Sequence, residues 1–264
     1  MFTGDVSFAF FLTVLAGLST GIGSFVALFS RRTNGSFLAL SLGFSAGIML
    51  YVSFMEMLPS SLSSLTDILG AKLANLYLIP AFFSGIVLIS VIDFVIPKGL
   101  NPHEVHGVEE MRGGGRLRRT GLLIALTVGL HNFPEGIATF TSALESLDVA
   151  IPIVVAIAIH NIPEGIAVSV PIYHSTGSRR KAFWYSFASG LSEPVGALIA
   201  YLFLRDIWTP TMSSIVLAVV SGIMVFISLD ELLPAAEKYG RHHHAILGVV
   251  FGMFVMALSL YLFV

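Results

Sequence analysis

A stretch that occurs twice decides the fold and the chemistry of this chain: HNFPEGIA at His131–Ala138 and HNIPEGIA at His160–Ala167. Each copy lies near the middle of a long apolar run. In a helix the His and the Glu, four residues apart, share a face, and the Asn lies beside them. Each Pro lacks an N–H, so the carbonyl four residues earlier, of Leu130 or Ile159, loses its helical partner. Imidazoles, carboxylates, amides and free carbonyls in an apolar run predict a cation site.

The composition is that of a membrane protein. Hydrophobic residues make up 55% of the chain and charged residues 11%, and the mean hydropathy is +0.88; an ordinary soluble domain is about 25% charged. We expect one transmembrane domain over residues 1–264, in the inner (plasma) membrane of a cell. The net charge of −2 gives no reason to expect nucleic acid binding. There is no Cys, so a metal would be held by nitrogen and oxygen donors, which suit Zn, Fe, Mn or Co.

Eight segments are long and apolar enough to cross a bilayer, which takes about 20 residues. They are residues 6–30, 36–58, 75–97, 120–143, 149–173, 182–204, 211–235 and 244–264. The connections between them are short except for 98–119, which contains Gly113–Gly115 and mixed charges and reads as a hydrophilic loop. The sequence therefore predicts an all-α polytopic fold of eight transmembrane helices.

The basic residues predict the orientation of these spans. Of the 14 Lys and Arg residues, only Lys72 and Arg205 fall in even-numbered loops. Cytoplasmic loops carry the excess of Lys and Arg. The odd-numbered loops, including 98–119, are therefore expected to face the cytoplasm, and both termini are expected to be extracytoplasmic.

The chain also repeats itself internally. AGIMLYVSFMEMLPS at Ala46–Ser60 aligns with SGIMVFISLDELLPA at Ser221–Ala235, and Gly17–Gly23 aligns with Gly190–Gly196. Span one thus resembles span six and span two resembles span seven, whereas spans three and eight show no match of their own. Partners five spans apart cross the membrane in opposite directions. We therefore predict that spans 1–3 and 6–8 are inverted repeats around spans four and five, with a site at the membrane midplane, as in secondary transporters.

The buried polar residues of the two motifs are expected to bind metal. An ionisable group at the bilayer centre costs about 2.5–3.5 kcal/mol or more on insertion, whereas a hydrogen bond between helices, the structural alternative, contributes only about 0.6 kcal/mol. A divalent ion between two carboxylates would remove their repulsion, and imidazoles favour transition metals over Mg or Ca. The expected ligands are His131, Asn132, Glu135, His160, Asn161 and Glu164.

A seventh candidate ligand lies in span six. Glu193 lies at the same depth as the motifs, and Pro194 after it frees the carbonyl of Gly190. In the repeat alignment its counterpart is Thr20, so the carboxylate occurs in one repeat only. This asymmetry favours a ligand role over a structural hydrogen bond.

Three acidic residues near the ends of spans are candidates for the ion pathway. Glu56 lies near the predicted outer end of span two, and Asp230 and Glu231 lie near the predicted inner end of span seven. They are interpreted either as carboxylates that gather cations at the two mouths or as interfacial acids that simply face water.

The motifs HNFPEG and HNIPEG, together with SGLSEPVG and GIMVFISLDELLP, resemble the signatures of the ZIP (Zrt/Irt-like) metal transporters over essentially the whole chain. The resemblance implies import of divalent transition metals into the cytoplasm, chiefly Zn²⁺ and also Fe²⁺, Mn²⁺, Co²⁺ or Cd²⁺, with no resident cofactor. It implies two adjacent metals between spans four, five and six. One would be held by His131, Glu135, His160 and Glu164, and the other by Asn132, Asn161 and Glu193 with the same two motif carboxylates as bridges. A homodimer is an open question.

Two other functions compete with transport. An intramembrane metal-dependent hydrolase would use a motif such as His-Glu-x-x-His, but Asn132 and Asn161 occupy the place of its general base. A purely structural membrane protein would leave the duplicated charges without a use. Divalent-metal transport is therefore the favoured hypothesis.

Overall fold

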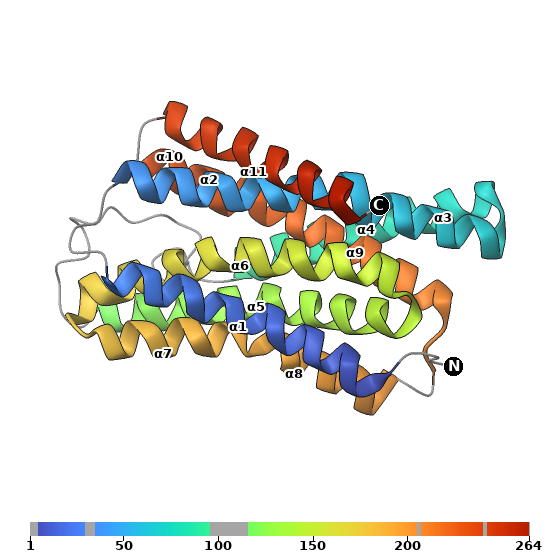
Figure 1. The fold of residues 1–264 in the computed structure, drawn as a ribbon, viewed down its shortest axis with the longest axis horizontal. Coiled ribbons are helices and arrows are strands. Elements are labelled where there is room, and N and C mark those ends of the chain that lie inside the picture. Colours follow the sequence, from blue (N-terminus) through green and yellow to red (C-terminus); the bar gives the residue numbers. More distant parts are fainter. Residues whose placement is uncertain (1–4, 30–34, 96–115, 205–206, 240–241, 264) are drawn as a thin grey trace.

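The computed structural model of the chain describes residues 5–29, 35–95, 116–204, 207–239 and 242–263, and the regular structure in these ranges is all helical (Figure 1). Three short segments, labelled η, are π-helices. In order along the chain the helices are α1 (Val6–Phe29), α2 (Gly35–Val52), η1 (Ser53–Met57), α3 (Leu58–Leu69), α4 (Ala71–Val95), α5 (Arg116–Glu145), α6 (Leu147–Thr176), α7 (Arg179–Gly190), α8 (Ser192–Ile199), η2 (Ala200–Leu204), α9 (Pro210–Ile227), η3 (Ser228–Leu232), α10 (Leu233–Tyr239) and α11 (His242–Phe263).

Within the described part of the chain, 6 helical stretches are long and apolar enough to cross a membrane. They are Val6–Phe25, Gly35–Leu69, Ala71–Phe94, Leu147–Val170, Pro210–Lys238 and His242–Leu262. These stretches overlap six of the eight predicted spans, and they make the chain a multi-pass membrane protein. The predicted end of span two at 58 is wrong, because the helix continues to Leu69. Gly35–Leu69 is the longest of them, with 35 residues, and ends at Gly70, whose φ of 80° lets the chain turn back into α4.

The other two predicted spans, 120–143 and 182–204, are helical but are not among the six. The second is divided between α7 and α8, which are separated by Leu191, three residues before Pro194. α5 begins at Arg116, so residues 116–119 of the predicted loop 98–119 are helical, which corrects its boundary. The rest of that loop lies outside the described residues.

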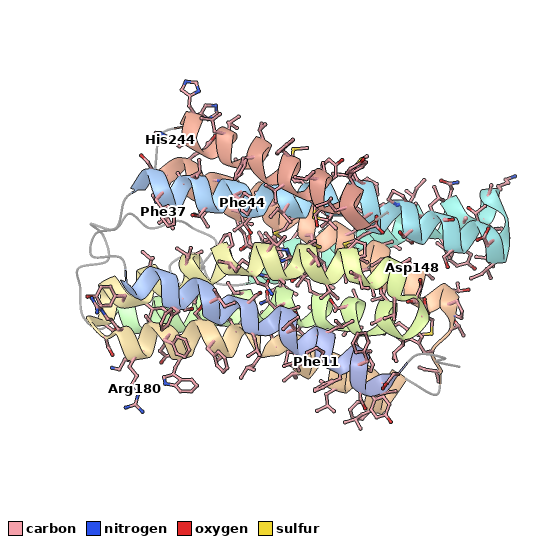
Figure 2. The ribbon with its side chains drawn as sticks, in the orientation of Figure 1. Phe11, Phe37, Phe44, Asp148, Arg180 and His244 are labelled. Carbon is pink, nitrogen blue, oxygen red and sulfur yellow. The ribbon has the colours of Figure 1, made fainter. Side chains whose placement is uncertain are left out.

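The helices form two groups (Figure 1). In one group α1 packs on α6, α5 packs on α8, and α7 packs on both α1 and α6. In the other group α2 packs on α11, and α9 packs on α3 and α4. Phe44 of α2, for example, contacts Phe251 of α11 with ring centroids 5.5 Å apart (Figure 2). The two groups meet where α6 packs on α2 and α5 packs on α9.

Glycines make matched helix contacts in the two halves of the chain. A Cβ at Gly23 would overlap the carbonyl of Ile162, and one at Gly196 would overlap the carbonyl of Phe133. Gly23 and Gly196 are aligned positions of the predicted repeats, and Ile162 and Phe133 are the same position of the two motifs. Small residues allow such close backbone approach between membrane helices. α1 therefore lies against α6 in the way that α8 lies against α5.

The π-helices are matched as well. η1 (Ser53–Met57) and η3 (Ser228–Leu232) fall at aligned positions of the longer predicted repeat, directly before Pro59 and Pro234. After η1 the backbone N–H of Leu58 donates to the carbonyl of Ser53, five residues earlier. After η3 the N–H of Leu233 donates in the same way to the carbonyl of Ser228. Such widened turns often mark functional sites, and here they contain Glu56, Asp230 and Glu231.

Candidate metal centre

The two motifs lie inside α5 and α6, which continue through Pro134 and Pro163 without a break. All seven predicted ligands are buried, and none exposes more than 2% of its surface. Six of them come from α5 and α6, and Glu193 comes from α8, which packs on α5. Helix packing therefore gathers residues that are up to 62 positions apart in the sequence into one group of helices.

The His and Glu side chains pair between the motifs rather than within one motif. Nε2 of His131 lies 3.0 Å from Oε1 of Glu164. Reciprocally, Nε2 of His160 lies 3.5 Å from Oε2 of Glu135. Each motif therefore supplies an imidazole to the carboxylate of the other, and all four side chains are fully or almost fully buried.

Glu193 joins the group through an amide. Nδ2 of Asn161 donates a hydrogen bond to Oε1 of Glu193 at 2.5 Å and another to the carbonyl of Ala16 at 3.0 Å. A Cβ at Gly136 would overlap the backbone of Glu193, so the glycine of the first motif lets α8 approach α5 closely enough to bring this carboxylate in. Contacts from α1, α6 and α8 thus converge on Asn161.

Several polar atoms of these residues are buried without a hydrogen-bond partner. They include both carboxylate oxygens of Glu135, both side-chain polar atoms of Asn132, Oε2 of Glu164 and Oε2 of Glu193. Burying polar groups without partners is unfavourable by roughly 1–3 kcal/mol each in protein measurements, and more for charged groups. A divalent cation held by the oxygens among these atoms would offset that cost, so these oxygens have the chemistry of metal ligands.

The side chains are arranged as pairs, not as a closed metal cage. Across the described residues, no group of three or more His, Asp and Glu side chains is arranged to hold an ion. The His131–Glu164 and His160–Glu135 contacts use the same nitrogen and oxygen atoms that would ligate a metal. A metal held by all four side chains would have to replace these two contacts.

The three predicted pathway acids lie outside this group, in η1 and η3. Glu56 and Glu231 are half-buried and Asp230 is exposed. Oε1 of Glu56 accepts a hydrogen bond from Oγ of Ser60 at 3.3 Å. Glu231 lies near enough to His131 to interact with it electrostatically.

Buried hydroxyls near the motifs were missed by the sequence analysis. Oγ of Ser45 on α2 donates to the carbonyl of His160 at 3.2 Å, which links the two helix groups. Thr20 and Thr139 are fully buried, and neither hydroxyl has a hydrogen-bond partner. Thr139 could have been found from the sequence, because it lies one helical turn after Glu135 on the same helix face.

Comparison with known proteins gives a consistent result. The family model described as ZIP Zinc transporter matches residues 97–260. The chain is 56% identical to the zinc transporter ZupT of Streptococcus mutans, with 97% of each chain covered. It is 53% identical to the zinc transporter ZupT of Clostridium perfringens, with 98% of this chain and 97% of that protein covered. It is 56% identical to the ZupT of Chlorobium luteolum, with 96% and 97% covered.

Proposed function

This chain belongs to the ZIP zinc transporter family, and on that premise we propose that it carries Zn²⁺ across the membrane into the cytoplasm. The family is one of transporters, so the chain is not an enzyme, and the hydrolase hypothesis has no support among the relatives. The observation that carries the proposal is the pair of buried carboxylates, Glu135 and Glu164, each facing an imidazole of the other motif.

The site proposed here is binuclear. One ion is held by the atoms that now form the two His–Glu contacts, those of His131, Glu135, His160 and Glu164. The second is held by Asn132, Asn161 and Glu193, with Glu135 and Glu164 as bridges. The hydrogen bond between Asn161 and Glu193 supports the second set, because it already brings an α6 residue and an α8 residue together. Oxygen and nitrogen donors also suit Fe²⁺, Mn²⁺, Co²⁺ and Cd²⁺, which we propose as further cargo.

The proposed topology has eight spans, with α5 as the fourth and α7, α8 and η2 together as the sixth. Both termini then lie outside the cytoplasm, and spans 1–3 and 6–8 are inverted repeats. The matched glycine contacts of α1 with α6 and of α8 with α5 support the repeats, as do the matched positions of η1 and η3.

The proposed mechanism is alternating access by movement of one helix group against the other. All seven ligands belong to α5, α6 and α8, which are in the same group, so this group can move with the site intact. Glu56 of η1 and Glu231 of η3 belong to the other group and would meet the ion on either side of the membrane. This assignment favours the pathway role over a role as plain interfacial acids.

The test is zinc uptake by the full-length protein in vesicles, measured with a zinc-sensitive dye inside. Glu135→Gln and Glu164→Gln keep the shape of the side chain but remove its charge, and each should reduce uptake at least tenfold because an essential ligand is lost. Glu237→Gln on α10 is the matched control, since Glu237 is exposed and pairs with His242; it should transport at the wild-type rate. Wild-type uptake by both motif variants would refute the proposal.

Two finer questions need separate measurements. Competition of Fe²⁺, Mn²⁺, Co²⁺ and Cd²⁺ against Zn²⁺ in the same vesicles tests the range of cargo, and a metal that does not compete is removed from it. The homodimer stays a prediction, which the mass of the purified protein in detergent would decide.

A further inference from the structure

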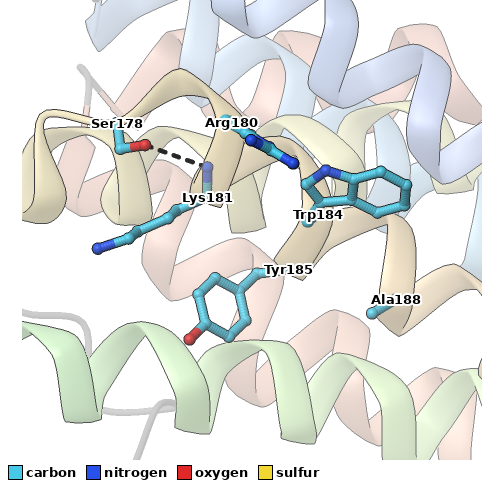
Figure 3. Close-up of a pocket in the computed structure, with 6 residues that line it drawn as sticks. All are labelled: Ser178, Arg180, Lys181, Trp184, Tyr185 and Ala188. Carbon is cyan, nitrogen blue, oxygen red and sulfur yellow. Dashed lines mark hydrogen bonds between the residues drawn. The ribbon is translucent and has the colours of Figure 1, made fainter.

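A pocket with a volume of about 450 Å³ opens to the surface at the start of α7 (Figure 3). It is lined by Ser178, Arg180, Lys181, Trp184, Tyr185 and Ala188. Arg180, Trp184 and Ala188 follow one another at intervals of four residues, so they form a single row along the helix. The walls of the pocket are mostly apolar, and its basic residues lie at the end of the helix where the span begins.

The pocket contains two cations, Arg180 and Lys181. In the part of the chain that the structure describes, neither Arg180 nor Lys181 forms an ion pair. Arg179 is already engaged, because its guanidinium lies 5.9 Å from the ring centroid of Tyr173. The side chain of Arg180 extends toward Trp184, while that of Lys181 extends the other way (Figure 3), and Arg180 projects outward from the bundle (Figure 2). The pocket therefore has an uncompensated positive rim.

The aromatic residues give the pocket a firm apolar wall. Trp184 is 54% exposed, yet Phe183 and Phe187 each contact its ring edge-on, with centroids 5.6 Å apart. Tyr185 is half-buried and packs on the cluster formed by Val168, Ile172 and Ala182. Trp and Tyr gather at the boundary between headgroups and hydrocarbon. Arg180 therefore marks the headgroup level, and Trp184 and Ala188 lie progressively deeper.

We propose that this pocket binds an anionic phospholipid, with its acidic headgroup at the rim that carries Arg180 and Lys181 and the apolar part of the lipid against Trp184 and Ala188. Charge complementarity carries this assignment, because unpaired cations beside a membrane attract acidic lipids. An exposed tryptophan one turn below the cations is expected where a lipid, rather than a soluble anion, occupies the site. The inference is independent of metal transport, since none of these residues belongs to the proposed metal site.

The chain offers a built-in reporter, because Trp184 and Trp208 are its only tryptophans and Trp208 is buried. Trp208→Phe leaves Trp184 as the sole tryptophan. The full-length variant is reconstituted in phosphatidylcholine vesicles that contain the same mole fraction of either brominated phosphatidylglycerol or brominated phosphatidylcholine. We expect stronger quenching of Trp184 by the brominated phosphatidylglycerol.

Removing the cations should remove the preference. Arg180→Gln and Lys181→Gln should each lower the preference for the anionic lipid over phosphatidylcholine by about fivefold. Lys238→Gln is the matched control, because Lys238 is an exposed cation on α10, outside the pocket, and it should retain the preference. Native mass spectrometry of the wild-type protein and of the two pocket variants repeats the comparison without Trp208→Phe.

Three results would overturn the proposal. One is equal quenching by the two lipids before any cation is removed. Another is an equal loss of preference in Lys238→Gln and in the pocket variants, which would indicate general surface charge. The third is a preference that inorganic phosphate abolishes and chloride at equal ionic strength does not, which would assign the pocket to a soluble anion.

Discussion

The two copies of the motif have nearly the same backbone surroundings but different polar surroundings. The glycine of the α5 copy, Gly136, allows α8 to approach at Glu193, and the glycine of the α6 copy, Gly165, allows α1 to approach at Thr20. Thr20 and Glu193 are aligned positions of the predicted repeats. The two matched helix crossings therefore differ in side chain: α1 carries a hydroxyl at this position and α8 carries a carboxylate, which is bonded to Asn161.

The two asparagines show the consequence of this difference. Asn161 in α6 donates to both Glu193 and the carbonyl of Ala16, whereas the side chain of Asn132 in α5 has no hydrogen-bond partner. Helix packing, which needs small residues at fixed positions, is thus the same in both halves. The hydrogen bonds of the motif asparagines, in contrast, are concentrated at Asn161 in α6. Substitutions that act on packing should therefore affect the halves equally, and substitutions that act on polar contacts should not.

The largest effect is expected for Gly136→Ala and Gly165→Ala. The new Cβ would overlap the backbone at Glu193 or at Thr20, and backbone cannot give way cheaply. Each variant should lose about 1–3 kcal/mol of stability, to a similar extent, and should lose zinc uptake. Thermal unfolding in detergent measures the first and vesicle flux the second.

Gly129→Ala is the control on α5, because the nearest atom to its new Cβ would be in the Ser192 side chain at 3.9 Å. It should retain stability and uptake. A loss in only one of the two motif variants would show that the halves are not packed alike.

The next effect should come from making the halves chemically alike. Glu193→Thr gives α8 the residue that α1 carries at the aligned position. Mutating a residue that supports a metal ligand typically lowers the metal affinity by about 10–100-fold. Removing a direct ligand should lower that affinity at least as much. The zinc concentration for half-maximal flux should therefore rise at least tenfold.

Thr20→Val alters the other half at the matching position and should change that zinc concentration much less. If Glu193→Thr leaves it unchanged, Glu193 is not a ligand, and its hydrogen bond with Asn161 is structural.

The two asparagines should differ in stability without metal. Asn161→Ala removes the donor for Glu193 and for the carbonyl of Ala16, and buried acceptors left unpaired are unfavourable by about 1–3 kcal/mol. Asn132→Ala removes no hydrogen bond and should be better tolerated. Thermal unfolding of both variants in the presence of a chelator measures this difference in stability. A larger loss of stability in Asn132→Ala than in Asn161→Ala would contradict the asymmetry between the two asparagines.

The smallest effect is expected at Ser45. Its hydrogen bond to the carbonyl of His160 crosses between the helix groups, and such bonds contribute about 0.6 kcal/mol on average. Ser45→Ala should barely change stability but should change the rate of zinc flux, because the contact must break when the groups move.

Ser61→Ala removes a hydrogen bond of 2.7 Å to the carbonyl of Ser214 within one group and should leave the rate unchanged. Equal rates in the wild type and in Ser45→Ala would argue against movement at this interface.

Much of this arrangement could be predicted from the sequence, because membrane helices are recognisable there as long apolar segments. Long apolar runs gave the helices, and the recurrence of Gly, Ile, Met, Glu, Leu and Pro pointed to the aligned stretches that contain η1 and η3. A motif repeated in adjacent helices indicated a shared site. All seven candidate ligands are buried, and their role as ligands of one site stays a prediction.

Other features depend on contacts that no local pattern contains. Spacing within a motif says that His131 and Glu135 share a helix face, but pairing of His131 with Glu164 depends on how α5 packs on α6. The π-helical turn at Ser53–Met57 adds one residue to a turn, and nothing in its composition distinguishes it from an α-helix. A proline alone does not predict the break between α7 and α8, since Pro134 and Pro163 leave α5 and α6 continuous.

The helix run Gly35–Leu69 has a consequence for the outline of the protein. At about 1.5 Å per residue its 35 residues reach roughly 50 Å, which exceeds the ~30 Å thickness of the bilayer hydrocarbon. With α4 folded back along it, the far end stands clear of the other helices (Figure 1). In the proposed orientation this far end projects from the extracytoplasmic face of the membrane, and an antibody applied from that side would reach an epitope inserted at Gly70.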